Sequence, residues 1–386
     1  MSVSKIKCLF PFTSLEIGKE GVFPCCPSWI KTGPLGDVRR ESIDEIWDGE
    51  KFQRLREKMY RGEFAETCSE TNCPFLLSGS MIDLDGLDRS AVFLSDAVWE
   101  DIRNERTLLS AGPSRVTLSD SGACNLKCIM CGSGRNYRGE DKEVSSRTMD
   151  EVAKILPGLR QIRLTGDGDP FFRKDTREFL VEFDPARYPN VEFIILTNGI
   201  MLNRKMWDKI KHNNIGEVWV SIDAATKETY EKIRVGGKWE TLMENLRLIS
   251  EIRKSGKFRM FEINMTVMRS NYREIVEFVR LGESLNCDQV ALQRFYGDTP
   301  ARENLFEPPD PGPLREIQRI LQDPVVSHAR VWREGLADVE RYQSSVVDRT
   351  RYEVHRLSVE ARKALDRHIL WRFAKRSKPG EAGVRG

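Results

Sequence analysis

The stretch Cys124-Asn-Leu-Lys-Cys128-Ile-Met-Cys131 decides how the rest of the chain is interpreted. Its three cysteines are spaced C-x3-C-x2-C and follow an apolar segment, residues 115–118, that is expected to form a strand. Thiolates are the protein ligands of iron–sulfur clusters, and three of them complete the coordination of only three irons of a [4Fe–4S] cube. The fourth iron stays open to an exchangeable ligand, as a catalytic metal keeps a free position. A zinc site is the alternative, although zinc cysteines usually come as C-x2-C pairs with a fourth ligand.

The composition indicates a globular protein without a nucleic-acid or membrane surface. Its 386 residues suffice for two domains or for a large barrel with additions. The 61 Lys and Arg residues nearly balance the 59 Asp and Glu residues, so the charge does not favour nucleic acid as a partner. No apolar run suits a signal peptide or a membrane span. We therefore expect a soluble, cytoplasmic protein whose nine cysteines serve metal binding or catalysis rather than disulfides.

The grouping of the cysteines predicts two separate metal sites. Five lie between residues 8 and 73, three form the tripod of Cys124, Cys128 and Cys131, and Cys287 stands alone before the last predicted strand. The first five belong to a block, residues 1–76, that reads as a short β-hairpin followed by a helix over residues 42–59. Such a block buries little apolar surface, so a bound metal would contribute to its stability.

Residues 114–298 alternate between strand and helix patterns. Helical crossovers between strands predict a parallel sheet, although alternation alone suits a doubly wound sheet as well as a barrel. Before this region, residues 77–113 form a polar connector; after it, residues 299–386 form a helical C-terminal extension whose end is expected to be disordered. The predicted strands are residues 115–118, 161–165, 191–197, 217–222, 262–268 and 289–294.

The cysteine spacing resembles that of the radical S-adenosylmethionine (SAM) superfamily. The resemblance implies an α/β fold, a partial (β/α)6 barrel with its functional groups at the carboxyl ends of the strands. It also implies that the tripod holds a [4Fe–4S] cluster whose open iron is chelated by SAM. One electron, from a donor such as flavodoxin or ferredoxin, then cleaves SAM to a 5′-deoxyadenosyl radical that abstracts hydrogen from the substrate.

Residues after the later strands match SAM contacts of this family. The loop Gly166-Asp167-Gly168-Asp169-Pro170 resembles the G-x-G-E-P loop that binds the amino group of SAM, with Asp169 in place of Glu. Alone, these five residues would be read as an ordinary turn. By the same resemblance Ser221 contacts the ribose and Arg234 the carboxylate. The other expected SAM contacts are Asn198, Asp223 (equally a helix N-cap), Met130 beside the adenine, and Leu292 (equally a core residue).

The first block resembles the SPASM/twitch auxiliary-cluster domain. The resemblance rests on Pro24-Cys25-Cys26 after the hairpin turn and on the helix start Ser42-Ile-Asp-Glu-Ile-Trp47. In most relatives this domain follows the barrel, whereas here it precedes it. The expected ligands of one auxiliary [4Fe–4S] cluster are Cys8, Cys68, Cys73 and either Cys25 or Cys26, and the choice between the last two stays open. Zinc on the same four thiolates is the alternative.

The leftover thiol of the Cys25–Cys26 pair suggests a function. A thiol has a weak S–H bond, so this side chain is expected to return hydrogen to a substrate radical. Radical SAM sugar epimerases of oligosaccharide biosynthesis resemble this design, and the first hypothesis is therefore epimerisation of a carbohydrate. The second is oxidative modification of a peptide or protein, as in maturases of ribosomal peptides or sulfatases, with the auxiliary cluster as electron acceptor. The third is a non-catalytic iron–sulfur or zinc scaffold.

Overall fold

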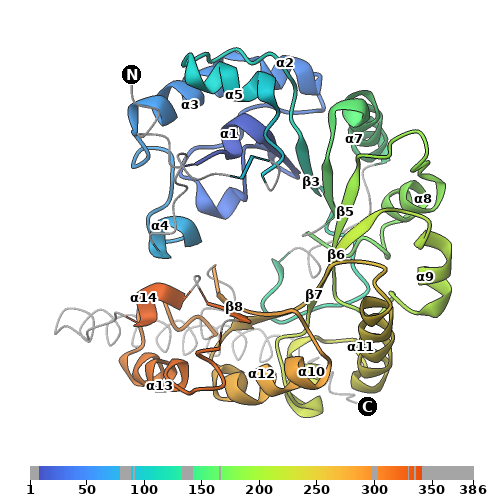
Figure 1. Ribbon diagram of the computed structural model, residues 1–386. Helices are drawn as coiled ribbons and strands as arrows, with labels where there is room; N and C mark the ends of the chain where they lie inside the picture. Colours follow the sequence, from blue (N-terminus) through green and yellow to red (C-terminus); the bar gives the residue numbers. More distant parts are fainter. Residues whose placement is uncertain are drawn as a thin grey trace, which may run out of the picture.

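The strands form one curved, open sheet in this computed structural model (Figure 1). The structure describes residues 8–78, 88–89, 92–132, 142–164, 167–296, 303–328, 330–333 and 336–340. The strand order is β2-β1-β3-β4-β5-β6-β7-β8-β9, and every neighbouring pair is parallel except the hairpin β1–β2. The strands are β1 Ser14–Gly18, β2 Gly21–Phe23, β3 Arg115–Ser119, β4 Gln161–Leu164, β5 Glu192–Thr197, β6 Ile215–Ser221, β7 Met260–Val267, β8 Gln289–Arg294 and β9 Val331–Trp332.

The six predicted strands are present as β3 to β8, which confirms the partial (β/α)6 barrel. Three further strands, β1, β2 and β9, extend the same sheet at its edges. The short hairpin was predicted, but its pairing with the barrel was not, because sequence periodicity does not reveal which distant strands pair. The segment before β1 is a short helix rather than part of the hairpin.

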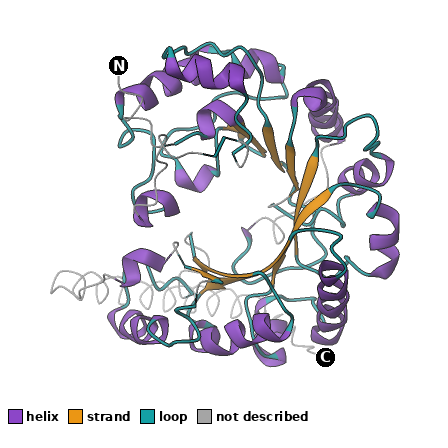
Figure 2. Ribbon diagram, in the orientation of Figure 1, coloured by secondary structure: helices purple, strands orange, loops and turns teal. Residues whose placement is uncertain are grey.

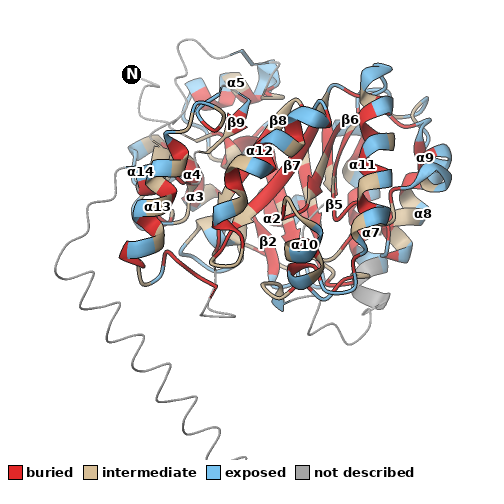
Figure 3. Ribbon diagram, turned by 90° about the horizontal axis from the view of Figure 1, so that it is seen from below, coloured by how far each residue is buried: buried red, intermediate tan, exposed pale blue. Residues whose placement is uncertain are grey.

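Helices cover the outer face of the curved sheet (Figure 2). Apolar side chains at alternate strand positions, such as Val116 and Leu118 of β3, are buried in the apolar core. Figure 3 shows the strands and the inner sides of the helices as buried. The helices are α1 Phe10–Thr13, α2 Ile43–Trp47, α3 Glu50–Arg61, α4 Pro74–Ser78, α5 Asp96–Arg103, α7 Lys142–Ile155, α8 Lys174–Glu182, α9 Arg204–Ile210, α10 Lys227–Ile233, α11 Trp239–Lys254, α12 Ile275–Ser284, α13 Pro311–Leu321 and α14 Ala337–Glu340, with 3-10 turns at Pro27–Trp29, Leu156–Gly158 and Tyr272–Glu274.

The helix predicted over residues 42–59 is divided into α2 and α3. The capping box is present as expected: Glu45 N donates to Ser42 Oγ at 3.2 Å and Ser42 N donates to the Glu45 carboxylate at 2.8 Å. Asp48 and Gly49 break the helix, with Gly49 in an extended conformation as the N-cap of α3. The break turns α3 so that Phe52 packs on Trp47, with ring centroids 5.3 Å apart.

The N-terminal block is fastened to the barrel by β1, which pairs in parallel with β3 from Ser14↔Arg115 to Gly18↔Ser119. Side chains add to this connection. Trp47 Nε1 donates to Ala111 O at 3.0 Å, and the backbone N–H of Ile43 donates to the Glu151 carboxylate of α7 at 3.1 Å. The block therefore continues the barrel sheet.

The C-terminal extension is described only in part. The predicted helix at residues 314–321 lies within α13, whereas the later predicted helices fall mostly in residues 341–386, outside the described residues. Across the opening of the sheet, α14 contacts α4. Among the described residues, no helix has the length and apolar character needed to cross a bilayer. The domain boundaries at residues 76, 113 and 298 stay a prediction.

Candidate active site

The tripod cysteines lie on the loop that follows β3, at the carboxyl edge of the sheet. Two backbone hydrogen bonds fix this loop to the end of α10 and the residues after it, from Lys127 N to Val235 O and from Ile129 N to Ile233 O, both at 2.9 Å. Burial, the Asp169 carboxylate and the neighbouring thiols of Cys128 and Cys131 together raise the pKa of the Cys124 thiol to about 11, against the effect of the Leu126 N–H. The three sulfurs are thus close enough to repel one another as thiolates, which fits a shared positive ligand.

Polar donors point at the tripod sulfurs. Cys124 Sγ accepts from Leu126 N at 3.4 Å and from Asn198 Nδ2 at 3.6 Å, while Cys128 Sγ accepts from Arg234 Nη1 at 3.8 Å. Donors of this kind stabilise thiolates and tune a bound cluster. Two predicted SAM contacts, Asn198 and Arg234, therefore lie next to the tripod.

Arg234 is held by Asp223, with 2.5 Å between Arg234 Nη2 and Asp223 Oδ2. Asp223 also accepts from Thr266 N at 2.7 Å, and it does not cap α10, whose N-cap is Thr226. Three buried polar atoms here have no partner among the described residues: Arg234 Nε, Tyr230 Oη and Asn264 Oδ1. Because buried polar atoms are normally hydrogen-bonded, unused donors and acceptors beside the tripod fit a polar ligand such as SAM.

The loop after β4 packs directly on the tripod loop. Gly168 has φ +101°, and a Cβ there would collide with the carbonyl oxygens of Ala123 and Ser121, so the approach requires glycine. Asp169 N donates to Ala123 O at 2.8 Å. The Asp169 carboxylate accepts from Thr197 Oγ1 at 2.7 Å, from Asn198 N at 2.9 Å and from Phe171 N at 3.0 Å.

Asp169 therefore organises the loops after β4 and β5, and its predicted contact with SAM stays a prediction. Gly166 lies outside the described residues. Ser221 ends β6 at the same edge of the sheet, and Met130 is half-buried against the apolar core. Leu292 is fully buried in that core, which favours its reading as a core residue.

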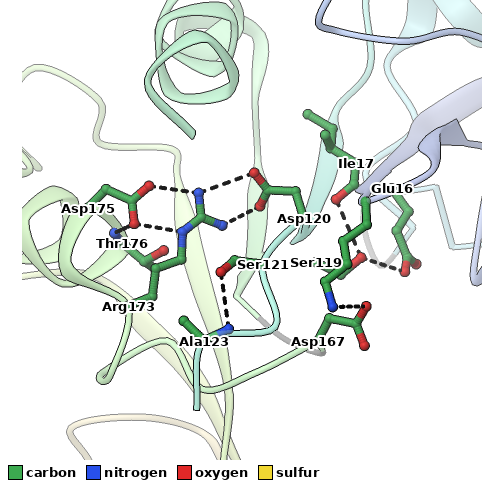
Figure 4. A network of polar contacts seen from close by, with 11 residues as sticks. Glu16, Ile17, Ser119, Asp120, Ser121, Ala123, Asp167, Arg173, Asp175 and Thr176 are labelled. Carbon is green, nitrogen blue, oxygen red and sulfur yellow. Dashed lines mark hydrogen bonds and ion pairs between the residues drawn. The ribbon is translucent and has the colours of Figure 1, made fainter. Parts of the chain in front are cut away.

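A polar network joins the tripod loop to its surroundings (Figure 4). Buried Arg173 lies between Asp120, which directly follows β3, and Asp175, to which its Nε donates at 2.6 Å. On the other side, Ser119 Oγ donates to Glu16 Oε1 of β1 at 3.0 Å. The turn of the N-terminal hairpin also reaches the loop after β4, through the Lys19–Asp167 ion pair at 3.3 Å. Of the residues in this network, the sequence patterns identified only Asp167.

The second group of thiols lies in the N-terminal block. Burial and the neighbouring thiols of Cys68 and Cys73 together raise the pKa of Cys8 to about 12. Burial also raises the pKa of Cys25, and the neighbouring groups of Cys8, Cys26, Cys68 and Glu16 act in the same direction. Backbone bonds from Lys31 N to Thr67 O at 2.7 Å and from Ser69 N to Trp29 O at 2.8 Å bring the two loops together. These contacts define the four-thiol group of Cys8, Cys25, Cys68 and Cys73.

Cys26 has different neighbours. Burial raises its pKa to about 12, the carboxylate of Glu16 adds to the rise, and the guanidinium of Arg163 opposes it. The Cys25 thiol lies near the thiols of Cys8 and Cys68, whereas the Cys26 thiol lies near the guanidinium of Arg163, and Glu16 is close to both. Within the described residues, no three His, Cys, Asp or Glu side chains converge on a point that would suit one metal ion. In a cubane cluster each thiolate binds a different iron.

The concave face of the sheet carries buried charged side chains that sequence reasoning missed. Arg163 of β4 lies over the ring of Trp219 of β6, with its guanidinium carbon 4.7 Å from the ring centroid. Burial lowers the pKa of Arg163, and the carboxylates of Glu217, Glu16 and Glu262 act in the opposite direction. We call the set Glu16, Arg163, Trp219 and Glu262 the polar belt. A sequence signal for these inward-facing residues was available, because polar or amphipathic residues alternate with apolar ones in Gln161-Ile-Arg163 and Glu217-Val-Trp219.

The two thiol groups lie at opposite ends of this face. A cavity of about 50 Å³ is lined by Cys25 and Cys26 and by Ser14, Arg115 and Gln161, the first residues of β1, β3 and β4. The tripod instead follows the last residue of β3. Five strand residues rise about 13 Å at about 3.3 Å per residue, so a substrate on the polar belt would lie between the groups. Cys287 is buried just before β8, near Glu262, and so lies at the amino end of the strands.

The comparisons with known proteins agree in both halves of the chain. Residues 118–282 match the model of the Radical SAM superfamily, and residues 8–74 match SPASM, an iron–sulfur cluster-binding domain. A probable GTP 3′,8-cyclase of Methanococcus maripaludis is 30% identical over 161 residues, covering 40% of this chain and 48% of the relative. A probable GTP 3′,8-cyclase of Saccharolobus islandicus is 26% identical over 210 residues, covering 54% and 64%. The chain thus spans about half to two thirds of the length of these curated relatives.

Solved structures are similar at lower identity. Streptococcus suis SuiB bound to precursor peptide SuiA is 14% identical, with 86% of this chain and 76% of that chain covered and a TM-score of 0.44. Histidine-tagged anSMEcpe with bound AdoMet is 17% identical, with 57% and 62% covered and a TM-score of 0.41.

Replacing Glu262 by Gln should remove a pH-dependent loss of stability. Burial raises the pKa of Glu262 from 4.5 to about 8, and Glu217 adds to the rise. The unfolded chain therefore loses this proton at lower pH than the folded protein, and stability falls as pH rises from about 4.5 to about 8, by at most about 1.4 kcal/mol per unit. Denaturation at pH 5 and pH 8 measures the effect. Glu283→Gln, an exposed position on α12, is the control; equal pH dependence of Glu262→Gln and wild type would contradict the assignment.

Proposed function

Because the chain belongs to the radical SAM superfamily and carries an N-terminal SPASM-type iron–sulfur domain, we propose that this enzyme abstracts hydrogen from a substrate on the polar belt and returns hydrogen through Cys26. Its cofactors are SAM and [4Fe–4S] clusters, one on the tripod and an auxiliary one. The observation that carries the proposal is the position of Cys26, which lines one cavity together with Glu16 and Arg163 of the polar belt.

The residues proposed to hold the cofactors follow from the site. Cys124, Cys128 and Cys131 hold the first cluster, and Cys8, Cys25, Cys68 and Cys73 hold the auxiliary one. Arg234 and the unused atoms around it bind the polar end of SAM. When bound, SAM and the tripod cluster supply a 5′-deoxyadenosyl radical, which abstracts a hydrogen atom from a C–H bond of the substrate.

Cys26 returns hydrogen from the other side. The S–H bond of Cys26 breaks, a C–H bond forms at the substrate radical, and a thiyl radical stays on the sulfur. One electron from a flavodoxin- or ferredoxin-type donor and one proton restore the thiol. Because Cys26 and the tripod lie at opposite ends of the concave face, the new hydrogen arrives on the face opposite to the one that was lost. The outcome is inversion of a carbon centre without net oxidation of the substrate.

The polar belt favours a polyhydroxylated substrate, and we propose a carbohydrate. Arg163 supplies donors, with Nε unused among the described residues, while Glu16 and Glu262 supply acceptors. A hydroxyl group both donates and accepts hydrogen bonds, so it satisfies such a mixed set. Phosphate would be repelled by the carboxylates around Arg163, and an ammonium group would be repelled by Arg163 itself.

One observation favours a second candidate function, the oxidative modification of a peptide. Cys25 of the four-thiol group lines the same cavity as Cys26, so an auxiliary cluster there would lie beside the substrate and could accept an electron from it. The two candidates differ in the origin of the product hydrogen. Inversion through Cys26 introduces one solvent-derived hydrogen, because thiols exchange with water, whereas oxidation introduces none.

The tripod variant Cys124→Ala/Cys128→Ala/Cys131→Ala tests the enzyme class. Anaerobic reconstitution of this variant should leave about four irons per chain, against about eight in the wild type, since each cubane holds four. Formation of 5′-deoxyadenosine from SAM should be abolished, because no open iron remains. Continued SAM cleavage by the variant would rule out the proposed role of the tripod.

Cys26→Ala should lose inversion of the substrate, whereas Cys25→Ala should lose the iron of the auxiliary site. Wild-type enzyme is first incubated with oligosaccharides, peptides and GTP, and the substrate is recognised by the 5′-deoxyadenosine that it elicits. In deuterated water Cys26→Ala should keep both clusters and SAM cleavage but form no inverted, deuterated product. Cys25→Ala should lose the auxiliary irons. Normal inversion by Cys26→Ala, or a product without deuterium, would favour the oxidative candidate.

A further inference from the structure

We infer that Arg115, the first residue of β3, is a positioning residue of the auxiliary cluster site, where its guanidinium balances the negative charge of the four-thiol group. The inference rests on the proposed assignment of Cys8, Cys25, Cys68 and Cys73 as cluster ligands. It concerns a residue of the barrel rather than of the N-terminal block, so it makes the auxiliary site a product of both parts of the chain.

Arg115 is placed beside the four-thiol group by the sheet itself. The parallel register sets it opposite Ser14 of β1, and its Nη2 donates to Thr13 Oγ1 at 2.8 Å. Its guanidinium carbon lies 5.3 Å from the centroid of the Phe10 ring, two residues after Cys8. The side chain lines the cavity that Cys25 and Cys26 share.

The charge of Arg115 has no carboxylate partner among the described residues. Its Nε is buried and has no hydrogen-bond partner there, and the structure records no ion pair between it and an Asp or Glu. Burial lowers its pKa to about 10, Arg163 lowers it further, and only Cys8 acts in the opposite direction. By contrast, Arg173 and Arg234, two buried arginines close to the tripod loop, each have an aspartate partner.

A partly buried cation without a counter-ion is less favourable than a paired one, so an anion beside Arg115 would stabilise this site. Four cysteine thiolates on iron provide one, and the guanidinium correspondingly lowers the pKa of Cys8. The substrate is the competing anion, but three carboxylates already lie around Arg163, those of Glu16 and Glu262 in the polar belt and that of Glu217. The two arginines of the cavity thus have different neighbours. Arg163 lies among carboxylates, and Arg115 lies beside the thiol of Cys8.

The inference has a measurable electrostatic consequence. A cluster gains one negative charge when it is reduced, so a nearby cation and an N–H donor to its sulfurs favour the reduced state and raise the reduction potential. Removing the charge of Arg115 should therefore make the auxiliary cluster harder to reduce. A role limited to packing β3 would change stability and leave the potential unchanged.

The experiment uses the tripod triple-alanine variant, reconstituted anaerobically, so that the auxiliary cluster is the one observed. Its midpoint potential is measured by redox titration followed by electron paramagnetic resonance, with and without Arg115→Met and Arg115→Lys. We expect Arg115→Met to raise the oxidised-to-reduced ratio at the original midpoint at least tenfold, which is about 59 mV for one electron. Arg115→Lys, which keeps the charge, should shift it less.

Arg56→Met is the matched control. Arg56 is fully buried in the N-terminal block, where its Nε donates to Pro11 O at 3.0 Å and its guanidinium carbon lies 4.4 Å from the centroid of the Trp47 ring. It should change stability without shifting the potential. An unchanged midpoint in Arg115→Met would overturn the inference, and a raised KM for substrate with an unchanged midpoint would assign Arg115 to the substrate instead.

Two results separate this inference from the proposed function. If the triple-alanine background itself holds no iron, the assignment of the four-thiol group fails first. If Arg115→Met alone loses iron while Arg115→Lys and Arg56→Met retain it, the charge is needed for the cluster to bind, which supports the inference.

Discussion

The parallel pairing of β1 with β3 is the interaction on which the site depends. It joins the N-terminal block to the barrel through backbone hydrogen bonds over five residue pairs, Ser14↔Arg115 to Gly18↔Ser119. The carboxyl end of β3 leads into the tripod, and the return strand β2 brings Cys25 and Cys26 to the amino end. One strand pair thereby sets the separation of the two thiol groups. The order of the block and the barrel along the chain matters less than this pairing, since it is the sheet that fixes their positions.

Because the barrel is open, its concave face has room for polar and ionisable side chains. In a closed barrel of parallel strands, layers of bulky apolar side chains fill the interior. Here the apolar side chains of the strands pack outward beneath the helices, and ionisable side chains such as Arg163 and Glu262 occupy the inner face. Charges in such a place are unfavourable without partners, and they offset one another across β1, β4, β6 and β7. The same arrangement leaves donors such as Arg163 Nε available to a ligand.

The parts predictable from sequence were those encoded locally. The tripod spacing, the capping box at Ser42 and the six barrel strands depend on residues close together in the chain, and all are present. The role of Asp223 as partner of Arg234 and the division of the Cys25–Cys26 pair depend on tertiary contacts. No spacing indicates which of two adjacent cysteines faces a distant strand. Arg115 and Arg163 read as ordinary strand residues until the sheet places them beside the thiols.

The central claim is that Cys25 belongs to the auxiliary cluster and that Cys26 faces the substrate, opposite the tripod. Diffraction from anaerobic crystals of the reconstituted enzyme with SAM, recorded at the iron absorption edge, tests it directly. The account predicts two iron sites, one on Cys124, Cys128 and Cys131 and one on Cys8, Cys25, Cys68 and Cys73, with the Cys26 sulfur uncoordinated beside Glu16 and Arg163. Iron bound to Cys26, or no iron in the N-terminal block, would contradict it.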